Sequence, residues 1–162
     1  MEVPFPEPGA HAARREGNVQ TLRAGANRGP HLAHHVGEGG VTLEALARVS
    51  GTLLVVGTGP LVSELRKTAA RLGVADRVRW LGHQNDEFVA AAYRAAMALW
   101  FASVARSEGF GLAQVEAMAS GCPVINTAIP ASGVPWVSPN EVSGLTVPVG
   151  DAGALGQIDL YQ

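Results

Sequence analysis

Two carboxylates flank a glycine-containing segment in the second half of the chain. Glu108 is followed directly by Gly109, Phe110 and Gly111, and Glu116 lies eight positions after Glu108. A helix is predicted to begin near Gly111, which puts Glu116 about one and a half turns into it. Free N–H groups at a helix N-terminus bind phosphate, and glycines let a phosphate approach the backbone. A carboxylate accepts hydrogen bonds from paired hydroxyls, as in recognition of a ribose.

The simpler interpretation makes Glu116 an exposed helix residue and Glu108 a loop charge. It suffices for either carboxylate alone, because charged residues are mostly exposed. It does not explain why both occur together with two glycines directly before a helix start. The combination favours a site for a nucleotide, with its phosphates at the helix N-terminus and its ribose on Glu116.

Short apolar strands alternate with amphipathic helices after residue 40, and this order would position the site. The predicted strands are residues 52–56, 77–81, 97–102, 123–126 and 144–147. Helices are expected near residues 43–49, 61–72, 86–96 and 111–120, with Asp86 as an N-cap. Such alternation predicts an α/β, Rossmann-like fold, a parallel sheet with helices on both faces. Ligands of such sheets bind beyond the carboxyl ends of the strands.

The first predicted strand leads into Gly57-Thr58-Gly59-Pro60, which invites comparison with nucleotide-binding loops. A dinucleotide fingerprint needs a third glycine where Val62 stands, and a P-loop needs a lysine where Pro60 stands. A plain strand-to-helix turn therefore explains this loop better.

Composition limits the classes of function. The 162 residues suit one domain or part of one, and the net charge of −2 with 12 basic residues offers no nucleic-acid-binding face. The single cysteine, Cys122, precludes a disulfide framework and reads as a small apolar residue. His31, His34 and His35 lack a further ligand nearby, so a solvated arm is expected rather than a metal site.

Residues 1–40 differ from the rest, with seven glycines, four prolines and Phe5 as the one aromatic residue. We expect residues 1–40 to form a poorly ordered or loosely attached arm and residues 41–162 to form the folded domain. No apolar run is long enough to span a bilayer, and no secretory signal is expected at the N-terminus. A cytoplasmic location is the expectation.

The segment EGFGLAQVEAMASGCPV, beginning at Glu108, resembles the E-x7-E signature of the retaining glycosyltransferases of family 4. The resemblance extends over roughly residues 52–154 and includes VVGTGP, VRWLG and GLTVPVGD in the family's order. It implies the C-terminal, nucleotide-sugar-binding half of a GT-B enzyme of two Rossmann-like halves. The likeness is strongest to sugar transferases of cell-wall and O-antigen assembly.

This resemblance implies roles for individual residues. Glu108 would be the catalytic-site carboxylate that contacts hydroxyls of the donor sugar, and Glu116 would hold the ribose. The segment that would meet the diphosphate through backbone amides comprises Gly109, Phe110, Gly111 and Leu112, and the residues that would border the base are Gln84 and Asn85. The nucleotide sugar is the substrate, and neither a separate cofactor nor a metal is expected.

The chain also departs from the family pattern. An Arg and a Lys that neutralise the diphosphate are expected before the first glycine turn, but no Arg or Lys lies between Arg28 and Arg48. A glycan or lipid-linked acceptor would be bound by an N-terminal half that this sequence lacks. We therefore expect the isolated chain to be inactive or weakly active, and the full enzyme to be peripheral at the inner face of the membrane. The alternative is a non-catalytic nucleotide-sugar-binding or Rossmann-like interaction module.

Overall fold

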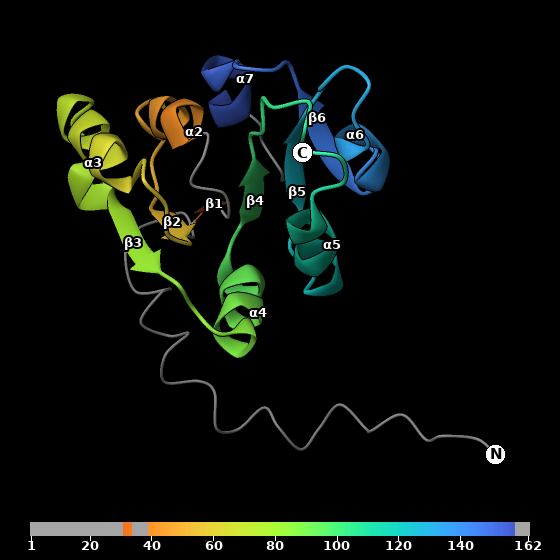
Figure 1. Cartoon of the computed structure of the whole chain (residues 1–162), viewed down its shortest axis with the longest axis horizontal. Coiled ribbons are helices and arrows are strands. Elements are labelled where there is room, and N and C mark those ends of the chain that lie inside the picture. The colour runs from red at the N-terminus through yellow and green to blue at the C-terminus, as the bar shows by residue number, and fades with distance from the viewer. Residues whose placement is uncertain (1–30, 34–38, 158–162) are drawn as a thin grey trace.

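A computed structural model describes residues 31–33 and 39–157 (Figure 1). Within these residues, six parallel strands form one sheet in the order β3-β2-β1-β4-β5-β6. The strands are β1 (His31–Ala33), β2 (Leu53–Val56), β3 (Val78–Gly82), β4 (Ala98–Phe101), β5 (Val124–Thr127) and β6 (Gly144–Val147). The helices are α2 (Gly39–Leu46), α3 (Val62–Arg71), the 3-10 turn η3 (Ala75–Arg77), α4 (Asp86–Ala95), α5 (Leu112–Ala119), α6 (Val134–Val137) and α7 (Ala152–Gln157).

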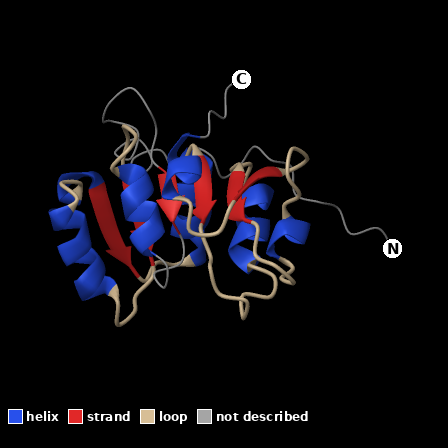
Figure 2. Ribbon diagram, turned by 90° about the horizontal axis from the view of Figure 1, so that it is seen from above, coloured by secondary structure: helices blue, strands red, loops and turns tan. Residues whose placement is uncertain are grey.

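This strand order is that of a doubly wound nucleotide-binding fold. The order reverses at β1, whose neighbours are β2 on one side and β4 on the other. Helices lie on both sides of the sheet when the molecule is viewed from above (Figure 2). The predicted α/β, Rossmann-like fold is therefore confirmed.

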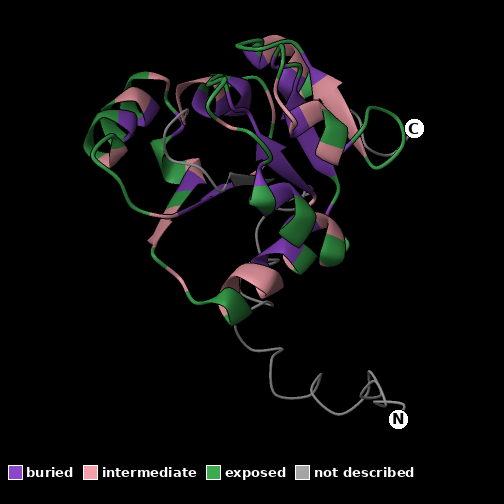
Figure 3. Ribbon diagram, turned by 45° about the vertical axis from the view of Figure 1, so that its right-hand side comes forward, coloured by how far each residue is buried: buried purple, intermediate pink, exposed green. Residues whose placement is uncertain are grey.

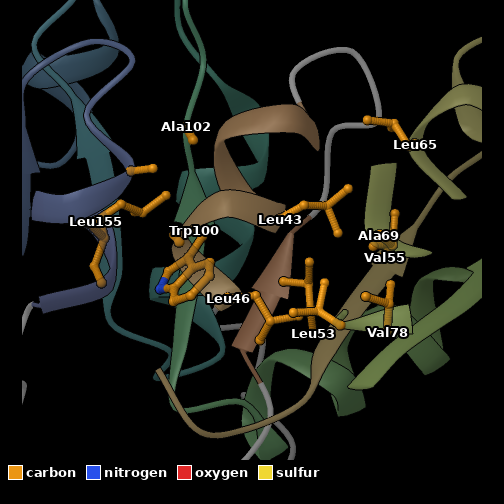
Figure 4. Close-up of a cluster of buried hydrophobic side chains, with 14 of the residues drawn as sticks. Leu43, Leu46, Leu53, Val55, Leu65, Ala69, Val78, Trp100, Ala102 and Leu155 are labelled. Atoms are coloured by element: carbon orange, nitrogen blue, oxygen red, sulfur yellow. The ribbon is translucent and has the colours of Figure 1, made fainter. Parts of the chain in front are cut away.

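Alternating side chains on the strands build a separate core on each face of the sheet. Leu53 and Val55 point toward α2, α3 and α7, where they join the cluster drawn in Figure 4. Leu54 and Val56 point to the other face and join the cluster that α4 and α5 cover. β2 and β4 are buried on both faces of the sheet (Figure 3). This explains why they read as continuous apolar runs rather than as alternating ones.

The predicted boundary at residue 40 is wrong for part of the arm. β1 lies in the middle of the sheet, where His31 pairs with Leu53 on one side and Ala98 on the other. β1 has three residues, His31–Ala33, and they contain no apolar run from which a strand could be predicted. Pairing with two neighbouring strands stabilises it. Residues 1–30 and 34–38, with His34 and His35, lie outside the described residues.

The predicted helices are present, with shifted ends. α4 begins at Asp86 as expected, but its N-cap is Asn85, whose Oδ1 accepts a hydrogen bond from the Phe88 N–H at 2.8 Å. Gly73 follows α3 with φ of +69°, the left-handed backbone that glycine commonly adopts directly after a helix. α6 and α7 were not predicted, and both are short helices, of four and six residues.

We expect Arg77→Met to lower the free energy of unfolding by about 2–3 kcal/mol, since hydrogen bonds to a charged group contribute ~1.5–3 kcal/mol. The Arg77 guanidinium donates to the Leu46 carbonyl at 2.8 Å and the Val49 carbonyl at 2.6 Å, and so stabilises the end of α2. Urea denaturation measures the change. Arg79→Met is the matched control, because among the described residues the exposed Arg79 donates only to the nearby Asp76 carbonyl. Equal losses in both variants would contradict this role of Arg77.

Candidate functional site

A cavity of about 630 Å³ opens between α4 and α5, at the carboxyl ends of β2 and β3. These two helices are neighbours below the sheet in Figure 1. The lining residues are Val56 and Gly57 after β2, His83 and Gln84 after β3, Asp86, Val89, Ala90 and Tyr93 on α4, and Glu116, Ala119 and Ser120 on and after α5. The wall thus combines small apolar side chains with carboxylate, amide and hydroxyl groups, a composition typical of ligand sites.

Glu116 is an exposed residue of α5 and lines the cavity. Tyr93 lies in the same wall, but its side chain is almost completely buried. Burial, together with the charge of Glu116, raises the pKa of Tyr93 far above its ordinary value. The phenol therefore stays neutral at physiological pH, and the carboxylates of the cavity wall are those of Asp86 and Glu116.

The loop before α5 carries the other carboxylate. Glu108 is half-buried, and its Oε1 accepts a hydrogen bond from the Gly111 N–H at 3.1 Å. Gly111 is the N-cap of α5, so this carboxylate lies directly over the helix start. The structure therefore brings Glu108 and the glycine segment together, and it puts Glu116 further along the same helix.

The two glycines of the loop have different surroundings. Gly111 has φ of +71°, and an added Cβ would lie 2.8 Å from Cζ of Phe101. An added Cβ at Gly109 would meet no atom within 4 Å. Gly111 is thus required by the fold, whereas Gly109 leaves open space beside the backbone. The predicted contacts of Gly109, Phe110, Gly111 and Leu112 with a diphosphate stay predictions.

The two residues expected to border the base have different positions. Gln84 lines the cavity, and its Nε2 donates to the Leu81 carbonyl at 2.6 Å, which orients the amide. Asn85 is not among the lining residues and caps α4 instead. A contact of Asn85 with a base stays a prediction without a geometric counterpart in this structure.

The sequence predicts no binding role for several residues that line the cavity. Tyr93, Val89 and Asp86 share one side of α4 because they lie three or four positions apart. Gly57 belongs to the glycine turn after β2, which the sequence predicts to be a plain strand-to-helix turn, and its N–H donates to the Gly82 carbonyl at 2.8 Å. This bond joins the turn after β2 to the end of β3. The helical spacing on α4 was the signal that could have found these residues.

Cys122 is buried in the core beneath α4 and α5, as a small apolar residue would be. Burial raises the pKa of its thiol to about 11. In residues 31–33 and 39–157, no group of three or more His, Cys, Asp or Glu side chains gathers that could hold a metal ion. Over the same part of the chain, no helix has the length and apolar character needed to cross a membrane.

Comparison with known proteins identifies relatives. The sequence pattern of the family described as glycosyl transferases group 1 matches residues 32–158. D-rhamnosyltransferase WbpZ of Pseudomonas aeruginosa is 34% identical over 117 residues, which cover 72% of this chain and 30% of that protein. O-antigen chain mannosyltransferase C of Escherichia coli is 31% identical over 115 residues, which cover 71% of this chain and 30% of that protein.

Solved structures agree with this relationship. Sucrose-phosphate synthase from Thermosynechococcus elongatus superimposes with a TM-score of 0.68 at 30% identity, over 85% of this chain and 36% of that chain. This chain therefore corresponds to only a part of such proteins. Since the family pattern extends from within β1 to the end of α7, the chain belongs to the group 1 glycosyltransferases.

Proposed function

We propose that this chain is the donor-binding part of a glycosyltransferase, which holds a nucleotide-activated sugar for transfer to a glycan or lipid-linked acceptor in surface polysaccharide synthesis. The proposal rests on the position of Glu116. This residue lines the cavity and belongs to α5, the helix that begins directly after the Glu108–Gly111 loop. Family membership and relatives named as rhamnosyl- and mannosyltransferases support the class of reaction.

The dimensions of α5 suit a nucleoside diphosphate. Glu116 lies five residues after Gly111, which corresponds to a rise of about 7.5 Å along a helix. A ribose held by Glu116 can therefore extend its diphosphate toward the helix start. There the helix dipole and free N–H groups favour negative charge. The base would lie against Val89 and Ala90, with the amide of Gln84 at its edge.

The charge of the leaving diphosphate needs stabilisation during transfer. The residues that line the described cavity include the carboxylates of Asp86 and Glu116 and no Arg or Lys. In this proposal, backbone N–H groups of the loop before α5 are the donors nearest the diphosphate. Glu108, at the helix start, would accept hydrogen bonds from hydroxyls of the donor sugar.

Transfer would proceed with retention at the anomeric carbon. The bond from that carbon to the diphosphate oxygen breaks as the acceptor oxygen forms a bond on the same face of the sugar. The acceptor's proton passes to the departing diphosphate, which serves as the base. Glu108 would position the sugar in this scheme and would not remove the proton.

A second candidate is a module that binds a nucleotide sugar without transferring it. The absence of Arg and Lys from the lining of the described cavity favours it, because fewer charges then stabilise the leaving group. Calorimetric titration with uridine and guanosine diphosphates and their sugars tests both candidates for binding. Following the release of nucleoside diphosphate in the presence of acceptors separates transfer from binding.

Glu116→Gln is expected to weaken binding of a nucleoside diphosphate by roughly ten- to a hundredfold, since each hydrogen bond to a charged group contributes ~1.5–3 kcal/mol. The amide keeps the shape of the side chain but cannot accept from both ribose hydroxyls with the same strength. Isothermal titration calorimetry measures the change in Kd.

Glu64→Gln is the matched control, because Glu64 is an exposed helix residue of α3 that does not line the cavity. Its Kd should equal that of the unmodified chain. An unchanged Kd in Glu116→Gln would remove the assignment of the ribose to this carboxylate. No binding of either diphosphate to the unmodified chain would refute the proposed function itself.

A further inference from the structure

Three consecutive carbonyl groups of the loop before α5 accept hydrogen bonds from other elements. The Ser132 hydroxyl donates to the Glu108 carbonyl at 2.5 Å, and the Gly133 N–H donates to the Gly109 carbonyl at 2.9 Å. Nε2 of Gln114 donates to the next carbonyl, that of Phe110, at 3.1 Å. The loop is therefore fixed along one side by the start of α6 and by a side chain of α5.

The approach of the two segments is close. An added Cβ at Gly133 would lie 2.3 Å from the carbonyl oxygen of Gly109, so a larger residue would separate them. The Ser132 hydroxyl also accepts a hydrogen bond from the Val134 N–H at 3.1 Å, which fixes its orientation. Ser132 thus connects the first turn of α6 to the backbone of Glu108.

The planarity of the peptide bond gives these contacts a consequence for the N–H groups. Each carbonyl and the following N–H share one plane and point in opposite directions. Holding the carbonyls of Glu108 and Gly109 against α6 therefore turns the N–H groups of Gly109 and Phe110 to the opposite side. Among the described residues these two N–H groups donate to no partner, whereas the Gly111 N–H donates to Glu108. Two donors are thus fixed in direction and available.

A buried polar network supports this arrangement from below. Gln114 and Asn126 are completely buried, and Nδ2 of Asn126 donates to Oε1 of Gln114 at 3.0 Å. The same Nδ2 lies 3.2 Å from the Val134 carbonyl and 3.0 Å from the Ser138 carbonyl. Asn126 of β5 thereby holds both ends of α6. It also holds the side chain of Gln114, which donates to the Phe110 carbonyl.

We propose that Ser132 is a positioning residue, which acts with Gly133 and Gln114 to direct the N–H groups of Gly109 and Phe110 at the diphosphate of the donor. This inference rests on the proposed function, because it assigns the two donors to a phosphate group. It adds one expectation. The part of the affinity that the phosphates contribute should depend on the Ser132 hydroxyl, although this hydroxyl does not contact the ligand.

Ser132→Ala tests the inference through two measurements on the full chain. Without nucleotide, hydrogen exchange should become faster at the amides of Gly111 and Gly133, which donate to Glu108 and to the Gly109 carbonyl, because one of three carbonyl contacts of the loop is lost. With nucleotide, calorimetry should show a five- to tenfold weaker Kd for guanosine or uridine diphosphate. The Kd of the corresponding nucleoside, which keeps the base and ribose, should change less than twofold. Ser143→Ala is the matched control, an exposed serine elsewhere on the chain.

Ser132→Thr and Ser132→Val separate the hydroxyl from the shape of the side chain. The threonine variant should bind diphosphate more tightly than the valine variant, which has the same shape without the donor. Unchanged exchange in Ser132→Ala would overturn the inference without any use of nucleotide. Faster exchange with unchanged diphosphate affinity would show that the hydroxyl supports the fold alone. Failure of the unmodified chain to bind either diphosphate would refute the proposed function, and this inference with it.

Discussion

Asn126→Leu is expected to lower the free energy of unfolding by about 3–4 kcal/mol, a large share of the ~5–15 kcal/mol typical of a whole domain. The leucine fills a similar space but removes the amide that donates to Gln114, Val134 and Ser138. Oε1 of Gln114 and the Ser138 carbonyl would then be buried without this donor. Each buried acceptor left unsatisfied costs ~1–3 kcal/mol. Urea denaturation followed by circular dichroism measures the loss.

Asn140→Leu provides the matched control for this variant. Its Oδ1 accepts one hydrogen bond, from the Thr146 N–H at 2.8 Å, at an exposed position. Water can replace that partner, so a loss of about 1 kcal/mol or less is expected. If Asn126→Leu were no more destabilising than Asn140→Leu, the buried network would not be what holds α6 against β5.

Much of the fold could be predicted because its signals are local. A buried run such as Leu53–Val56 followed by a glycine turn predicts a strand and a helix from neighbouring residues alone. β1 carries no such signal, since its residues are His31, Leu32 and Ala33. Its strand conformation depends on pairing with β2 and β4, which are distant in the sequence. Long-range pairing of this kind cannot be read from a single short segment.

The candidate site divides in the same way. Glu108 and Glu116 could be selected because they lie on one loop and one helix, so their spacing carries the information. The contacts that fix the loop come from Ser132 and Gly133, which lie 24 residues along the chain from the carbonyls that they bind. Nothing in the local pattern distinguishes Ser132 from an ordinary loop serine. Its role follows only from the position of α6 beside the loop.

The two loop glycines should respond in opposite ways to substitution by alanine. The sequence pattern predicts that a phosphate approaches the backbone at both glycines, but only Gly109 has open space beside its backbone. An alanine in place of Gly111 would have to adopt φ of +71°. Its Cβ would lie 2.8 Å from Cζ of Phe101 and 2.9 Å from Nε2 of Gln114. Left-handed backbone costs ~1–2 kcal/mol and overpacking ~1–3 kcal/mol, so Gly111→Ala should lose about 3 kcal/mol of stability.

Gly109→Ala should unfold at nearly the same urea concentration as the unmodified chain, because its Cβ meets no neighbouring atom. Its Kd for guanosine or uridine diphosphate should nevertheless weaken by roughly tenfold, since a methyl group would occupy the side from which the phosphate approaches. The pair thus separates folding from binding within three residues of one loop. A Gly109→Ala variant that binds diphosphate normally would place the phosphates elsewhere. A Gly111→Ala variant of unchanged stability would mean that Phe101 can move away at little cost, and that the tight contact beneath the loop is not what requires glycine there.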